Sequence, residues 1–441
     1  MTSSIYDLLG VGFGPANLAL DIAITETAEE NPSLSLSRVF LDSKPNQVWH
    51  PDLLLPSSLL QINVLKDLVT VVNPRSRFTF LNYLKEKGRL FEFLNLRDLF
   101  PTRIEFSDYL VWVSSQLEQD ALFNREVERV EPVAGEDGEI NLLRVVSRER
   151  KSGERNEYLA KNLVLATGGR PLLPKGIELK PGGRAFHPAE FLSRMERDFP
   201  DPRAPYRFVV IGSGQTGAEL FDYLLRSYPN ADVTSAIRRF AFKPVDESDF
   251  TNEIFFPRNT DFFFNLPDDK RREFFESLKD VNYAVVDHPL IRRIYRTLYD
   301  ERVAGRDRAR VLPFLELEGL SELPGQAEAY FRNPMTGERS TLRADAVVVA
   351  TGFERPLCHP LLEGVSPYLE TTSTGRYRVE RDYSITRRAG FLPKIYLQGD
   401  CEESHGISET VLSLVPVRAQ DILRSLHEAL AAREAPAVVA G

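Results

Sequence analysis

Two glycine-rich turns constrain the fold of this 441-residue chain more than any other feature. One lies in residues 6–20 and the other in residues 206–220, and in each an apolar run ends in glycines and leads into an amphipathic stretch. Their glycines are Gly12, Gly14, Gly212, Gly214 and Gly217. Glycines here let the backbone approach a pyrophosphate, whose charge meets the free N–H groups of the following helix. The sequence therefore predicts an α/β fold with two Rossmann-like dinucleotide-binding domains.

An Ala-Thr-Gly triplet repeats in the same way, at residues 166–168 and 350–352, each time after an apolar run. We expect each triplet to follow a late strand of its sheet. Small residues at such a point let the backbone pass close to a cofactor or to the neighbouring domain.

The two turns divide the chain into expected domains. We assign residues 1–200 and 341–441 to the first and residues 201–340 to the second. Residues 240–305 are rich in Phe, Asn, Asp and Arg without a strand pattern, which predicts a mainly helical insertion. Residues 51–103 are loop-rich and interrupt the first domain after a second strand at 36–42, whereas residues 431–441 have the composition of a frayed tail.

Composition excludes several classes of partner. The net charge of -9 repels nucleic acid and anionic membrane surfaces. Cys358 and Cys401 are the two cysteines and lie in no CxxC or His/Cys pattern, so we expect neither a disulfide framework nor a metal site. No apolar run is long enough to span a bilayer, and the first strand begins too near Met1 for a signal peptide. We therefore expect a cytoplasmic protein.

Charged residues after the second strand of each unit indicate the nucleotide. In the first unit Asn17 replaces the third glycine, and Asp42 is placed to accept a hydrogen bond from a ribose hydroxyl. In the second unit this position holds Arg238 and Arg239, with Lys243 close behind. Positive charge favours the 2′-phosphate of NADPH over NADH, although the same residues could form a solvated basic patch.

Two nucleotide sites in one chain suit a flavoprotein that takes hydride from NADPH. Without a redox-active cysteine pair, a disulfide reductase is disfavoured. Transfer of the electrons to oxygen or to a partner protein remains open on these grounds.

Six segments carry a more specific signal. They are residues 61–69, 73–84, 103–110, 250–255, 282–286 and 405–413. Together they closely resemble the microbial N-hydroxylating flavin monooxygenases of siderophore biosynthesis, the lysine N6-hydroxylases and ornithine N5-monooxygenases. The resemblance extends from Asp7 to about Ile422, and residues 73–76 and 408–413 are similar to the ornithine branch.

This resemblance implies an FAD site in the first domain, an NADPH site in the second and substrate binding by the helical insertion. It also implies that NADPH reduces FAD, that O2 adds at flavin C4a, and that the hydroperoxyflavin delivers oxygen to an amine nitrogen. Such an intermediate must be kept from water, and the amine must be neutral to react, which surroundings of low polarity favour.

The resemblance assigns roles to individual residues. Lys66 would hold the substrate carboxylate as a point charge, and Asn252, Asn282 and Ser413 would contact substrate. Gln61, beside the flavin, and Asn282, which also reaches the nicotinamide, are the catalytic candidates, whereas His405 is expected to be architectural rather than a base. The cofactor-binding candidates are Gly12, Gly14, Asn17, Asp42, Trp49, His50, Gln61, Gly212, Gly214, Gln215, Gly217, Arg238 and Asp400.

We therefore expect conversion of L-ornithine to N5-hydroxyornithine by a homo-oligomer, dimer or tetramer, that uses O2 and no nucleic acid. One alternative is an N-hydroxylase of another primary amine such as putrescine, lysine or histamine. An alternative of a different class is an NADPH-dependent electron-transfer flavoprotein reductase, and a third is a cofactor-binding regulator without catalysis.

Overall fold

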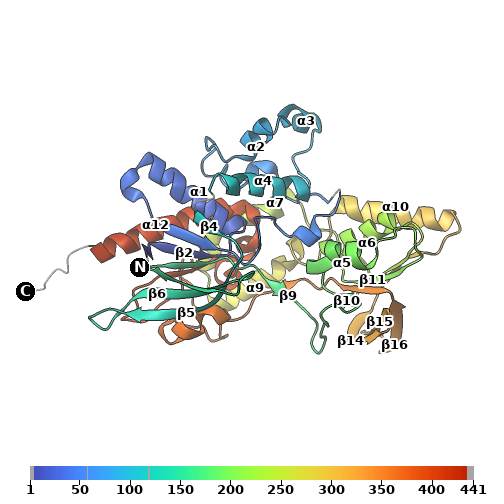
Figure 1. The fold of residues 1–441 in the computed structure, drawn as a ribbon. Helices are drawn as coiled ribbons and strands as arrows, with labels where there is room; N and C mark the ends of the chain where they lie inside the picture. The colour runs from blue at the N-terminus through green and yellow to red at the C-terminus, as the bar shows by residue number, and fades with distance from the viewer. Residues whose placement is uncertain (1–3, 57, 118–119, 435–441) are drawn as a thin grey trace, which may run out of the picture.

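The computed structural model describes residues 4–56, 58–117 and 120–434, which form two α/β lobes side by side (Figure 1). The first lobe contains a five-stranded parallel sheet whose order is β19-β8-β2-β3-β4. Its strands are β2 (Leu8–Val11), β3 (Arg38–Leu41), β4 (Ala121–Leu122), β8 (Leu163–Leu165) and β19 (Ile395–Leu397). The long helices α1 (Pro15–Glu30) and α12 (Val415–Glu434) pack against each other over this sheet. The central strands are apolar throughout because both faces of a parallel sheet are buried.

A second sheet in this lobe has the order β1-β7-β6-β5, and its strands are β1 (Ile5–Tyr6), β5 (Arg125–Ala134), β6 (Ile140–Glu149) and β7 (Arg155–Ala160). The strand-like segment at residues 5–11 is thus divided at Asp7 between two sheets. The carboxylate of Asp7 accepts hydrogen bonds from the backbone N–H and the hydroxyl of Ser37 at 2.9 and 2.7 Å. The 3-10 helix η8 (Pro360–Tyr368) packs against β5.

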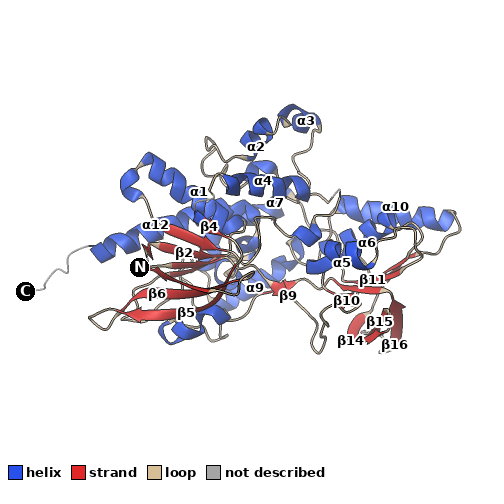
Figure 2. Cartoon of the chain, viewed as in Figure 1, coloured by secondary structure: helices blue, strands red, loops and turns tan. Residues whose placement is uncertain are grey.

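The second lobe contains another five-stranded parallel sheet, of order β10-β17-β11-β12-β13. Its strands are β10 (Ala185–Phe186), β11 (Arg207–Ile211), β12 (Asp232–Ala236), β13 (Ala309–Leu312) and β17 (Ala346–Val349). Helices α5 (Phe191–Asp198), α6 (Gln215–Ser227) and α10 (His288–Val303) share one apolar core with this sheet. An antiparallel sheet of β14 (Glu316–Leu323), β15 (Gln326–Arg332) and β16 (Arg339–Ala344) lies beside it (Figure 2). The prediction of two Rossmann-like domains is confirmed.

Strand pairing corrects both expected domain boundaries. β10, α5 and β17 belong to the second domain, although residues 185–198 and 346–349 fall in ranges expected for the first. The chain crosses between the lobes where β9 (Arg170–Pro171) pairs with β18 (Phe353–Glu354). Each crossing follows an Ala-Thr-Gly triplet, and the triplets do follow β8 and β17, as predicted. Short strands such as β10 join a sheet through long-range pairing, which local sequence does not encode.

Residues 51–103 are loops interrupted by short helices. These are η2 (Pro51–Leu53), η3 (Val64–Lys66), α2 (Phe80–Glu86) and α3 (Leu90–Asn95), followed by α4 (Arg103–Ser115). η2 crosses to the second domain, where Leu53 joins the apolar core and the Asp52 carboxylate accepts a hydrogen bond from the Ser193 N–H at 2.7 Å.

The insertion at residues 240–305 is helical, as predicted. It contains α7 (Asp249–Asn252), η6 (Glu253–Phe255), α8 (Pro257–Phe264), α9 (Asp268–Leu278), η7 (Lys279–Val281) and α10. α10 belongs to the core of the second domain, whereas α8 and α9 pack against α11 (Glu402–His405) of the first. The insertion therefore spans both domains.

Residues 431–434 of the expected frayed tail instead continue α12, and the rest of that tail lies outside the described residues. Among the parts of the chain that the structure describes, no helix is both long and apolar enough to cross a bilayer.

Candidate active site

The first glycine turn leaves space for a pyrophosphate. Gly12 has φ +84°, and a Cβ there would lie 2.5 Å from the carbonyl oxygen of Ala166, so only glycine fits against the Ala-Thr-Gly triplet. A Cβ on Gly14 would meet no atom within 4 Å. Gly14 caps α1 without a side-chain hydrogen bond, so first-turn N–H groups stay available. This cradle fits the diphosphate of FAD.

The second glycine turn repeats this geometry. A Cβ on Gly212 would overlap the carbonyl oxygen of Ala350, and one on Gly217 would lie 2.6 Å from the carbonyl oxygen of Gly212. Gly214 caps α6, again without a side-chain hydrogen bond. Both turns therefore use glycine for close approach to a strand end, and the N-terminus of α6 fits the diphosphate of NADPH. They differ in that a Cβ on Gly214 would lie 3.4 Å from the Cα of Ala284, whereas one on Gly14 would meet nothing within 4 Å.

Asn17 supports the first turn from beneath. Its buried amide donates to the carbonyl oxygen of Gly12 at 2.6 Å and accepts from Gln398 at 2.7 Å. Gln398 in turn accepts a hydrogen bond from Arg418 at 3.1 Å. Both hydrogen-bonding functions of the Asn17 amide are thus engaged inside the protein. We infer that it positions the turn.

The chain of buried polar groups continues to the C-terminal part of the first domain. Arg418 pairs with Glu409 at 2.7 Å, and Glu409 accepts backbone hydrogen bonds from Gly399 at 2.6 Å and Cys401 at 3.1 Å. Both charged side chains are almost fully buried. A buried ion pair requires further hydrogen bonds to compensate for the loss of water, and the two backbone N–H groups supply them to Glu409. The network joins residues 399–409 to the glycine turn. The sequence did not predict this network, although Glu409 lies within residues 405–413, one of the six segments that resemble the family.

Asp42 follows β3 and is 4 % exposed. One carboxylate oxygen accepts a hydrogen bond from the Phe13 N–H and the other from the Lys44 N–H, both at 2.8 Å. Asp42 therefore shapes the glycine turn. Each oxygen keeps a second acceptor position, and the contact with a ribose hydroxyl stays a prediction.

Trp49 and His50 lie where the domains meet. Their ring centroids are 5.0 Å apart, and the His50 ring lies 6.1 Å from that of Phe353 in β18. The crowding of the ring by surrounding protein, together with the charges of Lys44 and Arg103, lowers the pKa of His50 to about 4, although the residue keeps exposed surface. The imidazole is therefore neutral at pH 7.

Lys66 ends η3 with an exposed side chain and makes no ion pair within the described residues. Its backbone is held because the adjacent Asp67 accepts hydrogen bonds from the N–H groups of Val69 and Phe80 at 2.9 and 2.7 Å. η3 packs against η10 (Leu412–Leu414), which carries the buried Ser413. The structure thus brings the segments of Lys66 and Ser413 together, whereas Gln61 lies exposed in the loop before η3.

The two candidate asparagines lie on the insertion. Asn252 ends α7 and donates to the carbonyl oxygen of Glu247 at 3.1 Å, and Asn282 is exposed directly after η7. Next to Asn282, the Tyr283 hydroxyl bonds the Glu402 carboxylate. η6, which follows Asn252, packs against η9 (Ile407–Thr410). Both asparagines are therefore carried by segments that contact residues 402–410.

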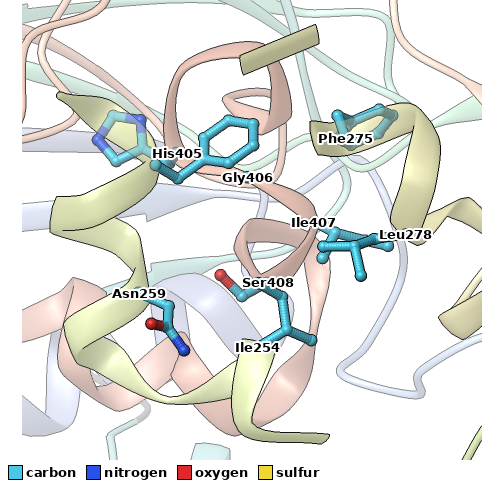
Figure 3. A pocket seen from close by; sticks show the side chains of 9 residues that line it. Ile254, Asn259, Phe275, Leu278, His405, Gly406, Ile407 and Ser408 are labelled. Carbon is cyan, nitrogen blue, oxygen red and sulfur yellow. The ribbon is translucent and has the colours of Figure 1, made fainter. Parts of the chain in front are cut away.

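A small pocket lies between the insertion and residues 405–408 (Figure 3). Its lining is mainly apolar and includes Ile254, Phe275, Leu278 and Ile407. His405 is buried beside it, and its ring nitrogens contact the Ser404 hydroxyl at 2.8 Å and the Arg381 carbonyl oxygen at 3.2 Å. Burial lowers the pKa of His405 to about 4, which suits the expected architectural role.

Asp400 follows β19, at the carboxyl edge of the first parallel sheet, where α/β sheets bind nucleotides. Burial raises its pKa to about 7, against the opposing charge of Arg376 at 3.4 Å. This partly neutral carboxyl lies between β19 and α11, and its contact with cofactor stays a prediction.

The three basic residues after β12 differ in their partners. Arg238 is 70 % exposed, and its nearest carboxylate oxygen, on Glu316, is 3.9 Å away. Arg239 lies 3.8 Å from Asp280, and Lys243 contacts the other oxygen of Asp280. Arg238 is therefore the cation most available to a 2′-phosphate.

Gln215, at the first position of α6, links the side chains of Glu219 and Asp287. It donates to Glu219 and to Asp287, at 2.9 Å each, and accepts from the Asp287 N–H at 2.9 Å. Glu219 pairs with Arg103 of the first domain at 2.8 Å. Gln215 was predicted from the sequence as a cofactor-binding residue, but the network that connects it to Arg103 was not. The signal that could have indicated it was that Arg103 begins residues 103–110, one of the six segments that resemble the family.

Comparisons with known proteins agree with this geometry. The model of the L-lysine 6-monooxygenase/L-ornithine 5-monooxygenase family matches residues 4–355. An L-ornithine N(5)-monooxygenase of Burkholderia cepacia is 41 % identical over 405 residues, covering 91 % of this chain and 90 % of that enzyme.

Two solved structures are similar over almost the whole chain. The ornithine hydroxylase PvdA from Pseudomonas aeruginosa has a TM-score of 0.89 at 38 % identity, covering 97 % of this chain and 100 % of that one. The ornithine N-hydroxylase KtzI from Kutzneria sp. 744, described with reduced FAD, NADP+ and L-ornithine, has a TM-score of 0.90 at 32 % identity, covering 98 % and 100 %. With two glycine cradles and a bridging helical insertion in place, this chain belongs to the L-lysine 6-monooxygenase/L-ornithine 5-monooxygenase family.

Proposed function

We propose that the protein is an FAD- and NADPH-dependent monooxygenase that converts L-ornithine to N5-hydroxyornithine for a siderophore or related product. The observation that carries the choice of an amino acid substrate is Lys66. Its ammonium group is exposed and without an ion-pair partner in the described chain, on a backbone held by Asp67 beside the segment of Ser413. An ammonium group so placed can pair with an α-carboxylate.

The rest of the site is assigned around this contact. Bound FAD and NADPH would supply reducing equivalents and the activation of O2. Asn252 and Asn282 would hydrogen-bond the amine end and the nicotinamide, because amides donate and accept without adding charge. Gln61 would lie near the flavin. Ser413 would contact the substrate, and the insertion would limit access of water to the reacting amine.

The rival substrates differ at the carboxylate. Putrescine and histamine lack it, so Lys66 would have no partner, and lysine would place its amine one methylene further away. The similarity of the chain to ornithine enzymes over more than nine tenths of its length supports ornithine.

An amine panel tests the proposal. Purified protein with FAD, NADPH and O2 is given ornithine, lysine, putrescine or histamine in turn, and the hydroxylated amine is quantified by mass spectrometry rather than by loss of NADPH, which also reports uncoupled peroxide formation. We expect N5-hydroxyornithine as the main product. Preferential hydroxylation of putrescine or histamine would exclude the carboxylate contact. NADPH oxidation that yields neither a hydroxylated amine nor hydrogen peroxide, and that proceeds only with an added electron acceptor, would favour an electron-transfer reductase.

We also propose a homo-oligomer. Phe91, Leu94 and Leu96, on and after α3, are apolar and 86, 54 and 67 % exposed, which supports their burial in an assembly. Sedimentation equilibrium would distinguish a dimer or tetramer from a monomer. The cytoplasm stays the predicted compartment.

A further inference from the structure

Asp280 holds two cations that a coenzyme 2′-phosphate would also attract. Its carboxylate contacts the Lys243 ammonium through one oxygen and lies 3.8 Å from the Arg239 guanidinium through the other. The hydrogen bond from Lys243 lowers the pKa of Asp280, so the carboxylate is charged at pH 7. Arg239 and Lys243 follow β12, the position where charge selects the coenzyme.

These contacts are exchangeable. The side chains of Arg239, Lys243 and Asp280 are 39, 45 and 49 % exposed, and ion pairs with such exposure are weak. A phosphate dianion presents more charge and more acceptor oxygens than one carboxylate. A bound 2′-phosphate can therefore replace Asp280 at Arg239 and Lys243, at little cost in broken contacts.

Asp280 also anchors the loop that carries Asn282. At the far end of this loop, Val286 donates its N–H to the carbonyl oxygen of Lys243 at 2.9 Å and accepts from the Val245 N–H at 3.0 Å. Between the two anchors, Ala284 has φ +55°, and a Cβ on Gly214 would lie 3.4 Å from its Cα. Asn282 thus lies on a short loop that residues 243–245 hold at both ends and that rests on the second glycine turn. Arg239 also donates to the carbonyl oxygen of Ala284 in this loop, at 3.4 Å.

We propose that Asp280 is an internal competitor for the 2′-phosphate of NADPH, and that phosphate binding at Arg239 and Lys243 releases the Asp280 end of the loop that carries Asn282. Asp280 is thereby a positioning residue, which links recognition of the coenzyme at its phosphate to the placement of an asparagine at the substrate. This inference rests on the proposed NADPH site.

Binding to the FAD-loaded protein tests the competition. Asp280→Asn keeps the size of the side chain and removes its charge, so we expect the Kd for NADP+ and for 2′,5′-ADP to fall by about fivefold, the upper range for an exposed pair. The Kd for NAD+ and 5′-AMP, which lack the 2′-phosphate, should stay unchanged. The matched control is Asp268→Asn, which makes the same change in net charge at a side chain that pairs with Arg271. An unchanged NADP+ affinity, or equal tightening for NAD+, overturns the proposal.

Amide hydrogen exchange tests the release of the loop. The Asn282 and Tyr283 N–H groups donate to the carbonyl oxygen of Lys279 at 3.2 and 2.8 Å. In wild type, 2′,5′-ADP should speed exchange at these two amides and 5′-AMP should not, because only the former has the competing phosphate. In Asp280→Asn, exchange should already be fast without nucleotide. Equal exchange with both nucleotides overturns the coupling.

Two arginine variants separate this inference from the proposed function. If Arg238→Ala and Arg239→Ala both bind NADP+ as tightly as wild type, the proposed phosphate site itself fails, and with it the inference. If Arg238→Ala weakens NADP+ alone while Asp280→Asn binds like wild type, the phosphate site stands and the role of Asp280 falls.

Discussion

Arg103 and Glu219 form an ion pair that joins the two nucleotide-binding domains. The Arg103 guanidinium donates a hydrogen bond to one carboxylate oxygen of Glu219 at 2.9 Å and lies 2.8 Å from the other, and the side chains are 19 and 5 % exposed. Arg103 begins α4 in the first domain, whereas Glu219 lies in α6, one turn after Gln215. A buried pair with this geometry is sensitive to the loss of either partner. It therefore fixes how the second glycine turn faces the first domain.

Glu219→Gln should slow the reduction of bound FAD by NADPH, measured by stopped flow. A shift of about 1 Å between reacting groups can cost on the order of 100-fold, and we expect a loss of at least about tenfold. The control is Glu301→Gln. Glu301 pairs with Arg308 inside the second domain at 3.0 Å, and their side chains are 8 and 15 % exposed. Equal slowing in both variants would indicate general destabilisation rather than domain positioning.

Gly14→Val should abolish flavin binding without unfolding the protein. The backbone at Gly14 has φ −80°, which valine adopts, and its Cβ would enter the open space assigned to the pyrophosphate. The purified variant should be colourless, and its melting temperature should match that of flavin-free wild type. Gly12→Ala, in contrast, should melt earlier because of its positive φ and the Ala166 contact. A yellow Gly14→Val protein would show that this glycine lines no phosphate.

Lys66→Ala should severely reduce hydroxylation of ornithine, by about 100-fold if the amine moves by about 1 Å. Flavin content and NADPH-driven flavin reduction should be preserved. The O2 that is consumed should be reduced to hydrogen peroxide instead of being used to hydroxylate the amine. Lys85→Ala, at another exposed lysine in α2, serves as the control and should behave as wild type. Hydroxylation by Lys66→Ala at the wild-type rate would make Lys66 a bystander.

His405 should make the protein less stable as the pH falls from 6.5 towards 4. Burial lowers its pKa from 6.5 to about 4 in the folded protein, so within this window the unfolded chain binds a proton that the folded chain does not. As the pH falls from 7 to 5, protonation of this group in the unfolded chain should lower the free energy of unfolding by about 2 kcal/mol. His405→Gln should remove that part of the pH dependence, as measured by urea unfolding. Parallel curves for both proteins would refute the assignment.

Local patterns in the sequence determined the two nucleotide-binding units. Gly12, Gly14, Gly212, Gly214 and Gly217, each next to a strand and a helix, predicted the cradles, and the two Ala-Thr-Gly triplets predicted the strand ends against which Gly12 and Gly212 pack. These predictions succeeded because the turn, its strand and its helix are neighbours in sequence, so the steric reason for each glycine is local.

Tertiary structure alone decided which side chains meet. Arg103 and Glu219, or Asn17 and Gln398, are more than a hundred residues apart, and no periodicity reports such a pairing. The same holds for β10 and β17, which were expected in the first domain but belong to the second because they pair with each other and β17 pairs with β11. Asp280, in η7, carried no signal in the sequence beyond its closeness to Asn282, because its proposed role depends on contacts with Arg239 and Lys243, which follow β12. The sequence by itself determined the two nucleotide cradles, and only the folded chain decided how they are joined, because ion pairs and sheet order form between distant segments.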